Sequence, residues 1–222
     1  MSEPATLEEM REMIEIPGKK YSIGKYQVTQ SLWESVMGNN PSDFKANSRP
    51  VECVSWLDCI LFCNKLSESQ GLEKAYLING EEVNCNFTAN GYRLPTEWEW
   101  WFAAKANQDS EYIGGDDIDD VGWYDGNSNG TTHNVGQKQP NGFGMHDMSG
   151  NVWEWCWDWF EGDSEWFTPV EGSTGPDDGS SRVNRGGSWF DDDWYARVSF
   201  RYWFNPSYQD HLIGFRLAQT LG

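Results

Sequence analysis

One segment in the middle of the chain carries residues suited to metal binding, Asp147-Met-Ser-Gly-Asn-Val-Trp-Glu154. Its carboxylates and carbonyls are hard oxygen ligands at close spacing, on a turn that enters a predicted strand. Ca²⁺ prefers ligands of this type. The alternative is that Glu154 pairs with an arginine inside a polar loop network. The residues alone leave both interpretations open.

A second segment carries residues suited to binding but none arranged for catalysis. Nine aromatic residues lie from Trp189 to Tyr208, mixed with Asp191, Asp192 and Asp193. Adjacent large side chains, as in Tyr202-Trp-Phe204, would point to both faces of any strand, so some of them are expected to face solvent. Exposed Tyr and Trp beside carboxylates offer a large contact area with little rotamer entropy to lose. The alternative is that these rings only pack the core or fill loops, as we expect for Trp189 and Phe215.

Other candidate chemistry is weak. The three histidines are scattered, and no Ser/His/Asp or Cys/His arrangement or phosphate-binding loop is visible. The five cysteines form no C-x-x-C pair, which argues against a zinc site, and Cys59 and Cys63 are interpreted as small buried residues. Glu97 and Glu99 are expected to be ordinary helix-start carboxylates.

Composition limits the partners. The formal net charge of −19 repels phosphate backbones and anionic membranes, so we expect no nucleic-acid binding. A basic ligand patch or a divalent cation is a more natural partner. No apolar run reaches the roughly 18–20 residues that span a bilayer, and no signal-peptide core follows Met1.

The predicted elements indicate one α+β domain with long ordered loops. Capping boxes at Ser55 and Thr96 predict helices to about Ser69 and Ala106, and a third helix is expected over 29–37. We also expect a helical lead-in over 7–14 and a hairpin over 76–87 with Asn79-Gly80 at its tip. Strands are expected at 20–29, 51–54, 150–160, 183–189, 196–200 and 214–218. In the strand over 150–160, Trp153, Trp155, Trp157 and Trp159 share one face, which is interpreted as core rather than as a sugar-stacking surface.

Six motifs follow one another from about residue 16 to residue 218: Gly24-Lys-Tyr-Gln-Val-Thr-Gln30, Pro50-Val51 with Val54-Ser-Trp56, Tyr92-Arg-Leu-Pro-Thr-Glu97, Asn141-Gly-Phe-Gly-Met-His-Asp-Met-Ser-Gly-Asn-Val-Trp-Glu-Trp155, Arg185-Gly-Gly-Ser-Trp189 and Gly214-Phe-Arg216. Together they resemble the formylglycine-generating-enzyme (sulfatase-modifying) family. This resemblance implies a variant of the C-type lectin fold, with two main helices and short distorted β-sheets. We expect a lead-in over 1–15 and this domain over 16–222.

The resemblance also carries chemical expectations. It implies structural calcium held by the side chains of Asp147 and Glu154 and the carbonyls of Gly150 and Val152. Enzymes of the family use two cysteines shortly after the Gly-Gly-Ser-Trp-like motif, and both are missing from Phe190-Asp-Asp-Asp-Trp-Tyr195. Without that thiolate the oxidase chemistry has no carrier, so we expect no enzyme activity and no redox cofactor.

The tail has a second resemblance, to the variable proteins of diversity-generating retroelements, which share this fold. In them, mutagenesis at template adenines rewrites a C-terminal region. An AAC or AAT codon changed at its first two bases yields Phe, Tyr, Asp, His, Asn, Leu or Ser, and an A-containing codon ending in G yields Trp. The variable, ligand-binding region is expected at about 185–218, with Arg185, Arg197, Arg201 and Arg216 in the fixed frame. The candidate ligand-binding residues are Phe190, Asp191, Asp192, Trp194, Tyr195, Phe200, Tyr202, Trp203, Phe204, Asn205, Tyr208, Asp210, His211 and Leu212.

These expectations combine into a non-enzymatic protein that displays a hypervariable aromatic surface. The resemblance implies a lipid-anchored lipoprotein on a bacterial cell surface, monomeric, whose ligand is a protein or another surface molecule. Two alternatives stay open: a carbohydrate-binding lectin, and a degenerate sulfatase-modifying-type oxidase.

Overall fold

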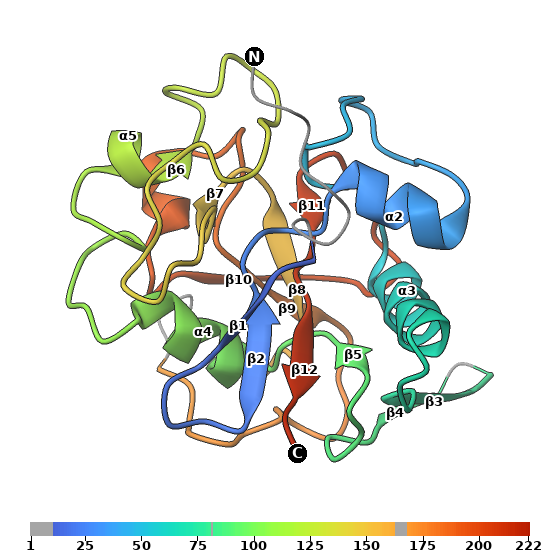
Figure 1. The fold of residues 1–222 in the computed structure, drawn as a ribbon. Coiled ribbons are helices and arrows are strands. Elements are labelled where there is room, and N and C mark those ends of the chain that lie inside the picture. Colours follow the sequence, from blue (N-terminus) through green and yellow to red (C-terminus); the bar gives the residue numbers. More distant parts are fainter. Residues whose placement is uncertain (1–10, 81, 163–167) are drawn as a thin grey trace.

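The computed structural model describes residues 11–80, 82–162 and 168–222. Two four-stranded sheets and four α-helices account for most of the regular structure in this part of the chain, and long ordered loops join them (Figure 1). The architecture is α+β, as the sequence predicts.

The first sheet joins the two ends of the described chain. Its order is β1-β2-β12-β5, with all neighbours antiparallel. The C-terminal strand therefore lies between two strands from the N-terminal half, as the red and blue arrows show (Figure 1). The strands are β1 (Met13–Glu15), β2 (Tyr21–Gly24), β5 (Tyr92–Arg93) and β12 (Ala218–Thr220).

The second sheet carries the tail, in the order β10-β9-β8-β11. Its strands are β8 (Trp153–Trp159), β9 (Arg182–Arg185), β10 (Arg201–Phe204) and β11 (Ile213–Gly214). The alternation in β8 is confirmed: Trp153 and Trp155 are buried on one face, and Glu154 is buried on the other. Gly214 in β11 packs directly against the neighbouring backbone. A Cβ at this position would lie 2.4 Å from the carbonyl oxygen of Val51.

The helices begin where the capping residues predict. The side chains of Ser55 and Thr96 accept hydrogen bonds from the backbones of Asp58 and Glu99, whose carboxylates bond back to the cap backbones. Such reciprocal caps satisfy backbone N–H groups that a helix start otherwise leaves unpaired. The helices are α2 (Gln30–Met37), α3 (Trp56–Ser69), α4 (Glu97–Lys105) and α5 (Ile118–Val121).

Short elements complete the domain. The predicted hairpin is present, as β3 and β4. A parallel pair, β6 and β7, and a 3₁₀ helix, η1, lie near the tail. Their bounds are β3 (Tyr76–Asn79), β4 (Glu82–Cys85), β6 (Gly122–Trp123), β7 (Ser149–Gly150) and η1 (Asp193–Ala196).

Four expected elements are wrong. The strand expected over 214–218 is instead the end of β11 and the start of β12, and residues 215–217 between them belong to neither. Residues 51–54 form no strand, because Cys53 has a left-handed φ of 59° that an extended strand cannot contain. Residues 196–200 are not a strand either: η1 ends at Ala196, and the next strand begins at Arg201. At the N-terminus, Met13–Glu15 is a strand and not part of a helix, while the rest of the expected lead-in, 7–10, lies outside the described residues.

Two large apolar clusters form the core. One packs α2 and α3 against β8, and its rings include Trp33, Phe62 and Phe215 in close contact. The other packs α4 against β2 and β9. No helix in the described part of the chain is long and apolar enough to cross a bilayer.

Candidate functional site

A buried ion-pair network fixes the start of the tail. Arg185, in β9, donates from Nε to Glu97 Oε1 at 2.9 Å and from Nη1 to the carbonyl of Phe200 at 2.8 Å. Arg201 donates to the other carboxylate oxygen of Glu97 at 2.7 Å. One carboxylate at the start of α4 thus holds two arginines of the tail, so Glu97 does more than the ordinary helix-start role expected of it.

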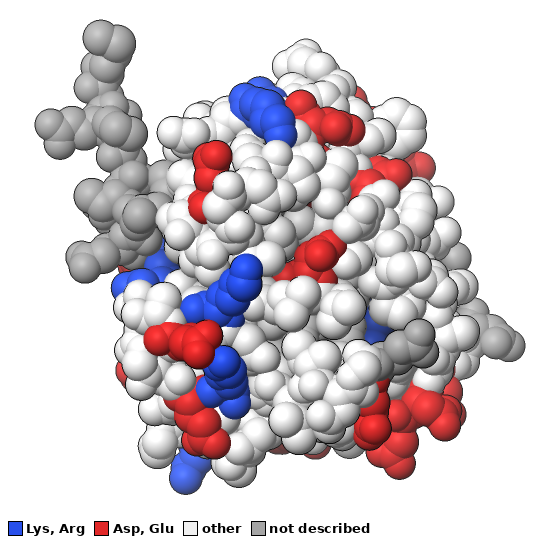
Figure 2. Space-filling model, turned by 90° about the vertical axis from the view of Figure 1, so that its right-hand side faces the viewer, with Lys and Arg blue, Asp and Glu red and all other residues white. Residues whose placement is uncertain are grey.

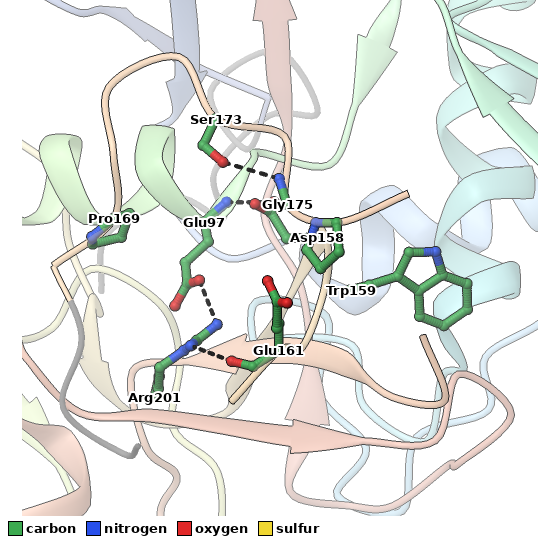
Figure 3. A pocket seen from close by; sticks show the side chains of 9 residues that line it. Glu97, Asp158, Trp159, Glu161, Pro169, Ser173, Gly175 and Arg201 are labelled. Carbon is green, nitrogen blue, oxygen red and sulfur yellow. Dashed lines mark hydrogen bonds and ion pairs between the residues drawn. The ribbon is translucent and has the colours of Figure 1, made fainter. Parts of the chain in front are cut away.

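The same carboxylate lines a pocket of about 280 Å³ (Figure 3). Asp158 lies beside Glu97 there, and its Oδ2 accepts a hydrogen bond from the Glu97 backbone at 2.7 Å. Burial, reinforced by the charge of Glu97, raises the pKa of Asp158 to about 8. Arg201 crosses the pocket to reach both Glu97 and the carbonyl of Glu161. Because Glu97 and Arg201 pair with each other and Asp158 bonds to the start of α4, we assign the pocket a structural role.

The tail carries a group of exposed and half-exposed side chains, which we call the aromatic surface. It consists of Phe190, Trp194, Tyr195, Tyr202, Phe204, Tyr208, His211 and Leu212. Several of its rings are in contact: Tyr202 lies 5.1 Å from Phe204, which stacks on Tyr208 at 4.9 Å. Tyr195 and Tyr202 both pack on the buried Trp153, at 6.4 and 5.7 Å. Phe190, Trp194 and Tyr208 are the most exposed, at 63%, 43% and 41%.

The buried frame supports these rings from beneath. Trp153 Nε1 donates to Asp191 at 2.8 Å, and Trp189 Nε1 donates to the carbonyl of His211 at 3.1 Å. The guanidinium of Arg197 lies 4.0 Å from the centre of the Trp194 ring. The exposed rings are therefore held in place before any ligand arrives, which lowers the entropy lost on binding.

One predicted contact residue is wrong. Phe200 is only 1% exposed, because its ring packs against Trp153 and Tyr195 inside the first cluster. Trp203 is only half exposed and stacks on Phe160, with ring centres 4.0 Å apart.

Several predicted polar contacts also shape the tail's own turns. Asp192 caps η1, Asp210 accepts from the backbone of Leu212 at 3.0 Å, and Asn205 accepts from that of Ser207 at 3.0 Å. Asp191 accepts from the backbone of Ser188 at 3.1 Å as well as from Trp153, and burial raises its pKa. Asp192 and Asn205 nevertheless remain exposed, whereas Asp191 is largely committed to the tail's own structure.

The predicted calcium segment is filled by nitrogen donors. Nε2 of Gln27 lies 3.1, 3.3 and 3.0 Å from the carbonyl oxygens of Asp147, Gly150 and Val152, and 3.0 Å from Glu154 Oε1. Three of these acceptors are atoms expected to ligate the ion, whereas the fourth is the backbone carbonyl of Asp147 and not its expected side chain. The Gln27 amide nitrogen carries two hydrogens, so it can satisfy only two of the four at once. The only sequence signal for Gln27 is its place in the Gly24–Gln30 motif.

Arg216 completes this arrangement. Its guanidinium donates to both oxygens of Glu154, at 2.6 and 2.7 Å, and Trp100 Nε1 donates to the same carboxylate at 2.5 Å. A buried guanidinium supplies the positive charge that a cation would otherwise bring. These contacts favour the alternative of a polar network around Glu154. The Asp147 carboxylate, whose Oδ1 is buried without a hydrogen-bond partner in the described structure, keeps calcium as the competing prediction.

Chelation tests this point. Because Arg216 already supplies a positive charge to Glu154, the polar network predicts that EDTA leaves the thermal midpoint unchanged and that added calcium does not raise it. The measurement is differential scanning fluorimetry of metal-stripped protein with and without calcium. A midpoint that rises with calcium concentration would restore the calcium site.

The thiols show no activated nucleophile. All five cysteines are free, and none lies between residues 157 and 222. Burial raises the pKa of Cys85 to about 12 and raises those of Cys59 and Cys156 well above the ordinary value. A protonated buried thiol is a poor nucleophile and a poor oxidation centre.

The charge pattern agrees with the sequence. On the side of the molecule that carries α2 and α3, Lys and Arg side chains are scattered among acidic ones, and the described residues form no continuous basic patch there (Figure 2). A polyanion such as nucleic acid finds no complementary surface on this face.

Comparison with known proteins decides the family. The model of the sulfatase-modifying factor enzyme 1-like domain matches residues 2–221. The chain belongs to this family. The predicted resemblance is thereby confirmed, and with it the C-type lectin type of fold.

The proteins similar to this chain include a variable protein, a chaperone and an enzyme. Treponema denticola variable protein 1 has a solved structure with a TM-score of 0.83 and 34% identity, covering 95% of this chain and 92% of that one. The chaperone protein LppX of Paenibacillus barcinonensis is 37% identical over 215 residues, 81% of this chain and 73% of LppX. The formylglycine-generating enzyme of Thermomonospora curvata is 29% identical over 214 residues, 86% of this chain but only 62% of that enzyme.

Proposed function

We propose that this chain is a non-enzymatic binding protein whose aromatic surface is diversified by a retroelement. The observation that carries the proposal is the division of the tail. Phe190, Trp194 and Tyr208 are exposed, whereas Arg185 and Arg216 of the same tail are fully buried in ion pairs. A rigid frame under exposed aromatic side chains lets the contact residues change without loss of the fold.

The similarity to Treponema denticola variable protein 1 supports this reading over that of an oxidase. The five thiols lie outside the tail, and burial keeps the pKa values of those in the core high. Enzymes are also among the relatives, so catalysis needs its own test. Neither oxygen consumption nor conversion of a cysteine-containing peptide is expected from the purified protein, and turnover of either would contradict the proposal.

The proposed ligand is a protein or another molecule met at the bacterial surface, bound by a monomer of this chain. The exposed rings would bury apolar area, and nearby acidic groups such as Asp192 favour a partner with basic side chains. A surface location, with a lipid anchor, follows from the resemblance to variable proteins and is part of the proposal.

Diversification predicts a pattern of natural variation. When the gene is sequenced from many isolates, differences within 185–218 are expected to fall on exposed positions such as Phe190, Trp194 and Tyr208. They should spare Arg185 and Arg216, which the frame requires. A reverse-transcriptase gene and a near-copy of this region are expected nearby in the genome. Variation spread evenly over frame and surface, or a locus with neither gene nor copy, would refute the retroelement assignment.

A further inference from the structure

Groups suited to metal binding gather at one edge of the aromatic surface. Asp43, Glu52 and Cys53 each place a ligand atom within 4.8 Å of those of the other two. Asp43 and Cys53 lie on the loop between α2 and α3, and Cys53 is held in its left-handed conformation with its backbone N–H donating to Asp210 at 2.9 Å.

The tail adds a nitrogen ligand to this group. His211 Nδ1 lies 3.9 Å from Asp43 Oδ2 and 3.6 Å from Asp210 Oδ1. The imidazole is 41% exposed, so a small rotation can bring its nitrogen closer to Asp43. Sulfur and oxygen atoms of Asp43, Glu52 and Cys53 therefore lie together, and the His211 nitrogen lies at the Asp43 side of this group.

Hydrogen bonds already orient two of these ligands. The buried carboxylate of Glu52 accepts from the backbone N–H groups of Asp43 and Phe44, at 3.0 and 2.9 Å, and its Oε2 lies 3.2 Å from the Cys53 sulfur. These bonds explain why Glu52 is buried, and the hydrogen bond from the thiol holds the Cys53 sulfur against the carboxylate. Such a mixture of thiolate, imidazole and carboxylate is the ligand set of zinc-type ions, whereas calcium takes oxygen alone.

We propose that Asp43, Glu52, Cys53 and His211 bind one divalent transition-metal ion of the zinc type. On binding, the Cys53 thiol loses its proton to solvent and a sulfur–metal bond replaces the S–H bond, with no change of oxidation state. In the metal-free chain, burial and the neighbouring Glu52 raise the pKa of this thiol to about 12, so it is protonated. The absence of a C-x-x-C pair argued against zinc from the sequence, but the ligands come together only in the fold.

A bound ion would tie the frame to the end of the aromatic surface. Asp43, Glu52 and Cys53 belong to the frame, whereas His211 occupies a position that the proposed function treats as variable. Metal binding itself does not depend on that function. One consequence alone rests on the proposed function: if position 211 varies, only chains that carry a metal-binding side chain there would complete the site.

Cobalt titration of the metal-stripped, reduced protein tests the site. One equivalent of Co²⁺ is expected to bind, with sulfur-to-metal charge-transfer absorption in the near ultraviolet, and Zn²⁺ is expected to displace it. Cys53→Ser should abolish the charge-transfer band. His211→Asn should weaken binding by about ten-fold or more, as losses of metal-site residues commonly do. The affinity is measured by competition with a chromogenic chelator.

Cys85→Ser is the matched control, because Cys85 is a half-buried thiol in the hairpin and outside the cluster. It should leave both the spectrum and the affinity unchanged. His211→Asn alters a partly exposed side chain, so it keeps the test decisive even if Cys53→Ser fails to fold. No charge-transfer band in the parent protein, or unchanged affinity in His211→Asn, would overturn the site. Neither result touches the proposed function, which is tested by sequence variation.

Discussion

Replacing Glu154 with glutamine is expected to lower the free energy of unfolding by about 3–5 kcal/mol. The carboxylate is fully buried and accepts from Arg216, Trp100 and Gln27. Glutamine has nearly the same shape but no charge, so the Arg216 guanidinium would remain buried without its counter-ion. Removing one partner of a buried pair is costly because the other charge has already left water.

Equilibrium unfolding in urea measures this loss. The matched control is Glu111→Gln, which removes the partner of Arg197 from an ion pair whose side chains are 25% and 47% exposed. Solvent screens such a pair, so the control should cost less than about 1 kcal/mol. Equal losses in the two variants would mean that the Glu154 network does not hold the frame together.

Phe200→Ala is expected to cost about 3–5 kcal/mol, whereas Phe190→Ala should change stability by no more than about 0.5 kcal/mol. The two residues are the same type in the same tail, but Phe200 is 1% exposed and Phe190 is 63% exposed. Truncating a buried ring loses its transfer free energy and leaves a cavity. Truncating an exposed ring does neither.

The pair tests which tail residues are free to vary. Thermal and urea unfolding of both variants give the comparison directly. Ser substitutions at Tyr202 and Phe204 should fall between the two, because these rings are half-buried against Trp153 and Trp155. A loss of several kcal/mol in Phe190→Ala would show that this residue packs in the core, and the proposal of an exposed binding surface would fail.

Elements that are determined by residues close together in the sequence could be predicted from it. The capping boxes at Ser55 and Thr96 and the turn at Gly80 act over three or four residues, and the elements they predict are present. The alternation of Trp and acidic residues over 153–159 likewise fixes which groups share a face of β8. The family motifs extended this to the whole fold, because they occur in order along nearly the whole chain.

Features that depend on contacts between residues far apart in sequence could not be predicted. Gln27 is 120 residues from Asp147, and Arg216 is 62 from Glu154, so the filling of the calcium segment could not be seen from its own residues. Phe200 looked like its aromatic neighbours, yet the bend after η1 turns it inward toward Trp153. Glu97 satisfies a local helix-start pattern and also meets two arginines about 90 to 100 residues away.

The position of β12 constrains how this tail can evolve. Directly after the aromatic surface, the chain enters β11, where Gly214 has no room for a Cβ beside Val51. It then enters β12, which is paired on both edges. A shift of register by one residue in β11 or β12 would put a side chain in place of Gly214 and reverse the inward and outward faces of β12. Changes of length are therefore confined to the loop between β10 and β11, whereas an exchange of bases at fixed codons leaves the register of both strands intact.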